Sequence, residues 1–535
     1  MSTSARLFFP IVLACALQPG CRSADTYEDH ANAVGARLVA EKSASIEDRP
    51  ETVARPLEVT PPDETPAEAV EGLEAEGPVA VDEPDKELIV LDLERALEIS
   101  IRSGREYLFE KEALLLDALA LSGTRNSFSP ILTTLLNYTF FDGNLIGELH
   151  SVGLTLGVSQ ILPWGGNIAA DVTSGFTGEP SGSAFASGAS VRYTQPLLRG
   201  SGHKISHEAL IQAERTLMYR IREFERFRES YAIDVASDYY GLVQQKQSLE
   251  NQYRNLEQLE FGLAQARAKF SMGEVPETDV LRTRRSVLTG QNGVLAAEVA
   301  LELALDQFRV SLGLPDGVRI DVEPQAPEFV SVGYDIESAI AVALENRLDF
   351  LNEKDRLVDV ERGLNIARNA LQPTFDFDAG YGLVGTGGSS FIRQNLNDHT
   401  WFAGLSLEVP VERVNERNAY RAAQISLARA HRNLEQFEDN LIVSLRNRFR
   451  SIERIELSLE IQRQAIEAEK RQTFIATLLF EQGERDNRDV VEAKQSLLAA
   501  ENALVDEQVT YEIERLNLLR DMGILFIDEK GMWTQ

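Results

Sequence analysis

The hydrophobic pattern of this chain repeats every seven residues along two long stretches, 242–308 and 452–518, which match position by position. Gly273 interrupts the first stretch and Gly483 interrupts the second. One apolar position per seven, maintained over many turns, is typical of helices packed in a coiled coil. The pattern therefore predicts two long helical hairpins of matching length, each with a glycine at its tip. The repeating positions are Leu242, Leu249, Leu256, Leu263, Phe270, Val280, Val287, Val294, Leu301 and Phe308, then Ile452, Leu459, Ile466, Thr473, Phe480, Val490, Leu497, Leu504, Tyr511 and Leu518.

The similarity between the two halves extends beyond the hairpins. Pro130 in RNSFSPILTT corresponds to Pro373 in RNALQPTFDF. Pro196 in YTQPLLRG corresponds to Pro410 in LEVPVERVN. The segment between the two prolines is therefore much longer in the first copy than in the second. This is a tandem duplication with unequal middle segments.

The middle segments alternate between apolar and polar residues, which predicts β-strands of about ten residues, the length that a tilted membrane strand needs. The candidates are 131–140, 150–161, 167–176 and 187–196 in the first copy, and 374–383 and 400–409 in the second. The extra residues of the first copy correspond to the pair 150–161 and 167–176. The sequence leaves open whether this pair belongs to the sheet, which then has six strands per chain, or lies outside it, which leaves four.

The chemistry of the chain argues against several classes of function. Its 53 basic and 84 acidic side chains give a net charge of −31, so nucleic acid is not an expected partner. No phosphate-binding loop, nucleophile elbow or cysteine cluster is present, and neither catalysis nor a cofactor is expected. His203 and His207 have a spacing that can hold a metal, but no third ligand stands nearby, so no metal site is predicted.

The amino terminus resembles an export signal. Arg6 precedes the apolar run LFFPIVLACAL at 7–17, which is too short to span a bilayer and suits a signal peptide. Gly20 and Cys21 follow, so residues 1–21 are interpreted as a signal peptide with Cys21 as a lipidation site. The alternative is an ordinary cleaved signal with an incidental cysteine.

Residues 22–87 are predicted to form a disordered acidic, proline-rich linker. No basic residue occurs between Arg55 and Lys86, whereas acidic residues are crowded there among prolines and alanines. Low hydrophobicity and uncompensated charge oppose collapse into a core. The segment is interpreted as a solvated tether.

Several short motifs, in this order and spacing, resemble the TolC-type outer-membrane efflux proteins. They are LDLERALEIS and its echo YDIESAIAVALENR, QPLLRG, and the two tips KFSMGEVPETDV and LFEQGERDNRDV. The resemblance covers roughly residues 88 to 525. It implies a mixed α/β membrane protein with an internal twofold repeat. A homotrimer would form a transmembrane β-barrel in the outer membrane of a Gram-negative bacterium, and a long coiled-coil α-helical barrel would extend into the periplasm.

The two copies divide the chain at residue 330. The first outer-membrane efflux repeat is 88–330, with a helix, strands within 131–196 and a hairpin at 203–313. The second is 331–535, with a helix, strands within 374–409 and a hairpin at 413–524.

The resemblance also suggests a gate at the hairpin tips. Thr278 and Asp279 on the first tip match positions that bond to an arginine on the second tip, which is Arg485 here. A charge-assisted bond between an arginine and a carboxylate can hold helices together. Phe480 stands where some members have a tyrosine, so one hydroxyl bond of this gate latch is missing.

Two further sets of residues at the tips follow from the resemblance. Asp489 and Glu492 match paired acids that ring the aperture, where three copies would place six carboxylates and favour cations. Gly273, Val275 and Gly483 are the expected docking points for a periplasmic adaptor protein.

The expected function is that of a passive export channel, opened by the adaptor and driven by an inner-membrane pump or ABC exporter. One alternative is a type I protein-secretion duct, which shares this architecture. Another, of a different class, is a soluble periplasmic coiled-coil scaffold whose alternating segments are not membrane strands.

Overall fold

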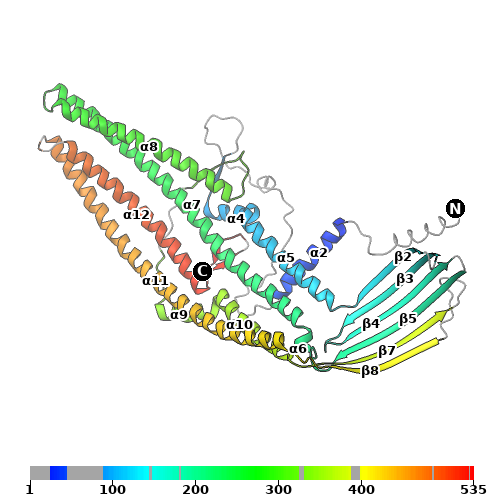
Figure 1. The fold of residues 1–535 in the computed structure, drawn as a ribbon. Coiled ribbons are helices and arrows are strands. Elements are labelled where there is room, and N and C mark those ends of the chain that lie inside the picture. The colour runs from blue at the N-terminus through cyan, green and yellow to red at the C-terminus, as the bar shows by residue number, and fades with distance from the viewer. Residues whose placement is uncertain are drawn as a thin grey trace, which may run out of the picture.

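The structure is a computed structural model. It describes residues 24–44, 88–143, 147–179, 182–323, 330–386, 398–482, 484, 487–528 and 530–534. Its shape is elongated, with two helical hairpins at one end, shorter helices in the middle and one curved sheet at the other end (Figure 1).

The first hairpin consists of α7 (Glu208–Ser271) and α8 (Glu277–Ser311), and the second consists of α11 (Val414–Glu481) and α12 (Asn487–Met522). A short helix, α6 (His203–Ser206), precedes α7. The 64 residues of α7 have a length of about 100 Å at a rise of about 1.5 Å per residue. The heptad positions are buried or half-buried, except Phe270, which is 45% exposed. The heptad seam therefore explains how each hairpin closes.

The two hairpins pack against each other through α7 and α12 (Figure 1). Leu259 and Val287 of the first hairpin form an apolar cluster on which Val491 of the second hairpin packs. Farther from the tips, the Asn251 amide donates to the Asn502 side-chain oxygen at 2.5 Å. The four helices thus form one layer in the order α8, α7, α12, α11.

The middle of the molecule contains two matching pairs of helices. They are α4 (Leu93–Ser103) with α5 (Arg105–Ser127), and α9 (Ile336–Asn346) with α10 (Leu348–Asn369). Asp92 caps α4 by accepting from a backbone N–H at 2.8 Å, and Asp335 caps α9 in the same way. These aspartates occupy equivalent positions in the two copies, so the motifs LDLERA and YDIESA have the same structural role.

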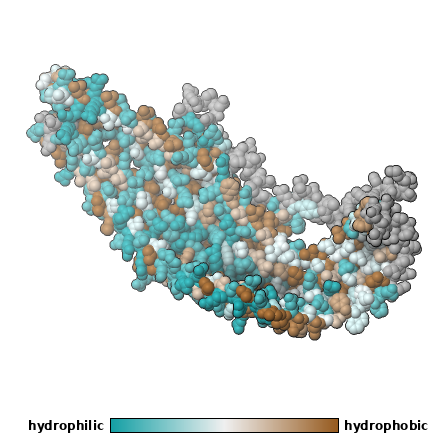
Figure 2. Space-filling view, in the orientation of Figure 1, coloured by the Kyte–Doolittle hydropathy of each residue, from teal (hydrophilic) through white to brown (hydrophobic). Residues whose placement is uncertain are grey.

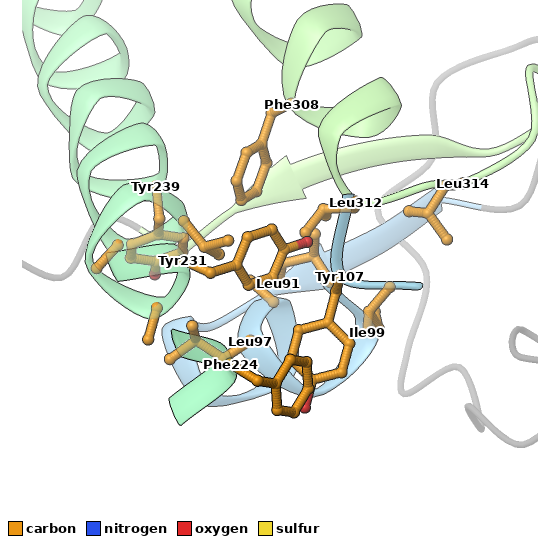
Figure 3. Close-up of a cluster of buried hydrophobic side chains, with 14 of the residues drawn as sticks. Leu91, Leu97, Ile99, Tyr107, Phe224, Tyr231, Tyr239, Phe308, Leu312 and Leu314 are labelled. Atoms are coloured by element: carbon orange, nitrogen blue, oxygen red, sulfur yellow. The ribbon is translucent and has the colours of Figure 1, made fainter. Parts of the chain in front are cut away.

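The main core lies where α4 and α5 pack on α7. Leu91 and Leu97 are buried there, and the Tyr107 ring lies 5.7 Å from Phe224 and 5.6 Å from Tyr231 between ring centres (Figure 3). A small parallel sheet joins β1 (Leu88–Leu91) to β6 (Arg319–Val322) beside this core. A second small sheet pairs β9 (Phe526–Ile527) with β10 (Trp533–Thr534). The core therefore holds in place the half of α7 that is nearer to the six-stranded sheet.

All six alternating segments are strands of a single antiparallel sheet. Its order is β2, β3, β4, β5, β7, β8. The strands are β2 (Ile131–Gly143), β3 (Gly147–Ile161), β4 (Asn167–Glu179), β5 (Gly182–Pro196), β7 (Thr374–Thr386) and β8 (Asp398–Glu408). The pair β3 and β4, whose place the sequence left open, lies inside the sheet between β2 and β5. The described chain therefore has six strands in this sheet.

The beginning of the expected linker is not disordered, so that part of the prediction is wrong. Helix α2 (Ala24–Ser43) packs on α5 and α7, with Leu38 and Val39 buried. The composition of 22–87 as a whole is acidic, but this first part carries apolar and basic residues that can bury and pair. Residues 45–87 lie outside the described residues.

Two ion-pair contacts attach α2 to its neighbours. Arg125 of α5 donates to the Glu41 carboxylate at 3.1 and 3.2 Å and to Glu214 of α7 at 2.8 Å. Lys42 lies 3.4 Å from Glu214. The hydrogen bond from Arg125 lowers the pKa of Glu41 below its usual value.

Candidate functional site: the hairpin tips and the two faces of the sheet

The first tip turns at Gly273, two residues after the end of α7. Its φ is +77°, and the Glu274 amide bonds back to the Lys269 carbonyl oxygen at 3.0 Å. A Cβ at Gly273 would meet no atom within 4 Å, so the backbone angle and not crowding favours glycine. Val275 is half-buried, and Pro276 precedes the first residue of α8. The expected docking residues Gly273 and Val275 thus form the turn itself, whereas Gly483 lies outside the described residues.

The predicted latch is only partly within the described residues. Thr278 is exposed in the first turn of α8. The Asp279 side chain is only 15% exposed, and its carboxylate lies 3.4 Å from the Arg282 guanidinium on the same helix. Arg485, its expected partner on the second tip, lies outside the described residues. A bond between Arg485 and Asp279 or Thr278 therefore stays a prediction.

The two expected aperture acids lie in the first turns of α12. Asp489 is half-buried, whereas Glu492 is exposed and lies 3.9 Å from the Arg488 guanidinium one turn earlier. Acidic residues near the start of a helix also interact favourably with its backbone dipole. Their arrangement as a ring depends on further copies of the chain, so this role stays a prediction.

A lysine that the sequence did not single out connects the two tips. The Lys269 ammonium, near the end of α7, donates to the Phe480 carbonyl oxygen at 2.7 Å. The same Nζ lies 4.0 Å from the centre of the Phe480 ring. The last carbonyl groups of a helix such as α11 lack partners within it and carry partial negative charge, which favours a cation there.

Phe480 thus takes part in a contact between the tips although it lacks the hydroxyl that a tyrosine would supply at this position. Phe480 is 4% exposed and packs in a small cluster with Ala476, Val490 and Ala493. Phe270, its counterpart in the first copy, is 45% exposed. Heptad position alone could not distinguish the two phenylalanines, because the difference depends on which hairpin face meets the other hairpin.

A narrow groove lies beside this contact, between the hairpins. Gln258, Gly262 and Thr283 line it from the first hairpin, and Phe480 and Lys494 line it from the second. Burial lowers the pKa of Lys494. Two lysines, 269 and 494, therefore lie at the seam between hairpins, close in sequence to the acids of the tips.

The two faces of the sheet differ sharply in chemistry. Paired residues of neighbouring strands point to the same side of the sheet, so each row of paired residues belongs to one face. One complete row across the six strands is Leu132, Val158, Ala170, Val191, Tyr381 and Trp401. The adjacent row is Thr133, Gly157, Asp171, Ser190, Gly382 and Thr400. The first row belongs to an apolar face, and the second to a polar face rich in glycine.

The apolar face is uncovered in the single chain. Leu132 is 76% and Trp401 is 73% exposed. Figure 2 shows hydrophobic side chains gathered along the edge of the sheet where Figure 1 places β8. On the polar face, the Ser190 hydroxyl donates to Asp171 at 2.5 Å and Thr194 donates to Asp378 at 2.7 Å. Such a sheet suits a boundary between an apolar medium and water.

Other candidate chemistry gains no support. The rings of His203 and His207 stack 4.5 Å apart, and within the described residues no group of three or more His, Cys, Asp or Glu side chains could hold a metal. Among the described helices, none is both long and apolar enough to cross a bilayer. Cys21, the expected lipidation site, lies outside the described residues, so its role stays a prediction.

Residues 339–523 match the family model of outer membrane efflux proteins, which covers α10 and the second hairpin completely and most of α9. The predicted resemblance to the TolC-type outer-membrane efflux proteins is thereby confirmed. Over 385 residues the chain is 22% identical to outer membrane protein TolC of Escherichia coli (strain K12), an alignment that spans 69% of this chain and 76% of that protein.

Two solved structures share the fold. The outer-membrane channel OprN superposes with a TM-score of 0.62 at 16% identity, covering 81% of this chain and 89% of that one. The CmeC outer membrane channel of Campylobacter jejuni superposes with a TM-score of 0.61 at 14% identity, covering 81% and 86%. The mixed fold of long helices and one sheet is therefore that of outer-membrane channels.

Proposed function

We propose that this protein is an outer-membrane efflux channel assembled from three copies. The sheets of the copies close one barrel in the outer membrane, and the hairpins line one tunnel in the periplasm. The observation that carries this proposal is a single sheet with an apolar face and two edges, β2 and β8, that pair on one side only within the described residues. In lipid, an unpaired strand edge costs several kcal/mol per backbone group, so the edges must be joined by other copies.

The helical layer supports the same assembly. Helices α8 and α11 lie at its two outer sides (Figure 1), and each carries exposed apolar residues. Those on α8 recur about every seven residues, as in a second coiled-coil seam. They are Leu281, Leu288, Leu295, Leu303 and Val310. Those on α11 include Leu457, Ile461, Ile475 and Leu478. Packing α8 of one copy on α11 of the next would cover both sets, and the number three follows from the family resemblance.

The tips are the proposed closed end, opened by a periplasmic adaptor. Phe261, Phe270 and Met272, near the first tip, are 70%, 45% and 65% exposed, which suits a docking surface for adaptor helices. The energy for export would come from an inner-membrane pump or ABC exporter, since this chain is proposed as a passive conduit.

The assembly is tested by fractionation. Heat-modifiable oligomers in the outer-membrane fraction, with a protein mass in detergent near three times the 59.5 kDa chain, would support the proposal. Monomers released with the soluble periplasmic proteins would contradict it and favour the coiled-coil scaffold.

The gate is tested separately in planar bilayers. Removing Arg485 would leave the carboxylate of Asp279 without its proposed partner on the second tip, a loss of about 1.5 to 3 kcal/mol per contact. Arg485→Ala should therefore raise conductance, and Arg267→Ala, at an exposed position on α7, is the matched control. Equal conductance of Arg485→Ala and wild type would contradict the latch.

A further inference from the structure

Strands β3 and β4 pair with neighbouring strands on both sides along nearly their whole length, so they are full members of the sheet. Every residue of β2 pairs with β3, and β3 in turn pairs with β4 from Ile161 to His150. On its other side β4 pairs with β5 from Asn167 to Glu179. Without this pair, each copy would contribute four strands. With it, the wall per copy is half as wide again.

The turn between β3 and β4 is hydrogen-bonded to the residues around α6, which precedes the first hairpin. The Gly202 amide donates to the Trp164 carbonyl oxygen at 3.1 Å, and the Ser206 hydroxyl donates to that of Pro163 at 2.9 Å. Gly165 has a φ of +90°, and a Cβ there would lie 2.5 Å from the Gly200 carbonyl oxygen. These contacts fix the extra pair where the sheet meets α6.

We infer that the barrel contains eighteen strands and is a wide pore for large hydrophilic cargo. This inference rests on the three-copy assembly proposed above. With strands about 4.8 Å apart and tilted by about 40°, eighteen strands give a barrel roughly 36 Å across between backbones. Twelve strands would give roughly 24 Å.

The lining of the proposed pore preserves most of its width. Three of the six residues in the polar row that contains Asp171 and Ser190 are small or lack a side chain: Gly157, Ser190 and Gly382. Small side chains of this kind narrow the pore only slightly. Hydrophilic solutes whose diameter approaches the backbone width of a twelve-stranded barrel would therefore fit the eighteen-stranded barrel, but not the twelve-stranded one.

A deletion tests the width directly. Replacing residues 144–181 by an Asn-Gly turn would join β2 to β5 and leave four strands, and their directions would be preserved because a pair is removed. In bilayers, polyethylene glycols of graded size are added on the side of the membrane away from the helical hairpins, and they measure which polymers enter the barrel. We expect the wild type to admit polymers that the deletion variant excludes. The same size limit for both would overturn the inference.

Cysteine labelling gives a second readout in case the deletion variant does not fold. Val172 and Thr173 are neighbours on β4 that point to the apolar and polar faces. In membranes, Thr173→Cys should react with a membrane-impermeant thiol reagent above the wild-type background, and Val172→Cys should not. Equal aqueous labelling of both would show that β4 is outside the membrane wall. A chain that is not trimeric in the outer membrane would instead contradict the proposed function.

Discussion

Lys269 joins the two hairpin tips, and its replacement tests whether this contact stabilises the proposed closed state. Its ammonium bonds to the Phe480 carbonyl oxygen at 2.7 Å and lies 4.0 Å from the Phe480 ring centre. Lys269→Met keeps most of the side-chain length but removes the charge and the donor. A hydrogen bond to a charged group contributes about 1.5 to 3 kcal/mol, and an exposed cation–π contact about 0.5 to 1 kcal/mol. Because Lys269 is half-buried, we expect a loss of about 2 kcal/mol per copy.

This loss should shift the channel toward its open state. About 2 kcal/mol corresponds to roughly a 30-fold change in an equilibrium constant. If three copies open together, the combined loss of about 6 kcal/mol corresponds to roughly a 10⁴-fold change. In planar bilayers, purified Lys269→Met protein should therefore spend much more time at high conductance than the wild type.

Arg267→Met is the matched control, since Arg267 is an exposed cation two residues earlier on α7. It should conduct like the wild type. If Lys269→Met also does so, the contact with Phe480 does not hold the tips together. If both variants open equally, the loss of positive charge at the tip is responsible, and the contact itself is not.

Four further predictions concern the tips and α2. Replacing Asp489 and Glu492 together by alanine should weaken cation selectivity in bilayers. An unchanged reversal potential would show that these two acids do not line the aperture. Gly273→Val would place a β-branched residue at a φ of +77°, which costs about 1 to 2 kcal/mol or more, and a thermal melt should show the destabilisation. Leu38→Ala should cost about 2 to 5 kcal/mol of α2 packing and make 24–43 sensitive to limited proteolysis. The same digestion should cut α2 faster as the pH falls below 4.5, the usual pKa of a glutamate. The hydrogen bond from Arg125 lowers the pKa of Glu41 in the folded chain, so protonation of Glu41 at low pH removes this stabilising pair. Glu41→Gln should abolish this dependence of cleavage on pH.

The hairpins and the sheet could be predicted because their signals are local. A heptad of apolar residues such as Leu459 and Tyr511 reports one buried helical face, and both residues are buried here. Alternation along 131–140 or 374–383 likewise reports a strand with two unlike faces. The register then follows once neighbouring strands pair, and it places Tyr381 opposite Trp401.

Contacts between elements could not be predicted in the same way. The pairing of Lys269 with Phe480 depends on which face of α7 meets the second hairpin, and no local pattern records that choice. The helix α2 was missed for a different reason, because the strongly acidic composition of 22–87 masked the short segment around Leu38 that has a binding surface on α5. In both cases, tertiary packing decided the outcome.

The central claim is that the edges β2 and β8 of neighbouring copies join to close one barrel. Disulfide cross-linking tests it most directly, with one cysteine on β2 at Leu132 or Leu136 and one on β8 at Trp401 or Leu405, all on the apolar face. Oxidation of outer membranes should give dimers and trimers on a non-reducing gel, with the trimer as the largest species. Exclusively monomers for every pair, or a ladder that continues beyond three copies, would contradict a closed three-copy barrel.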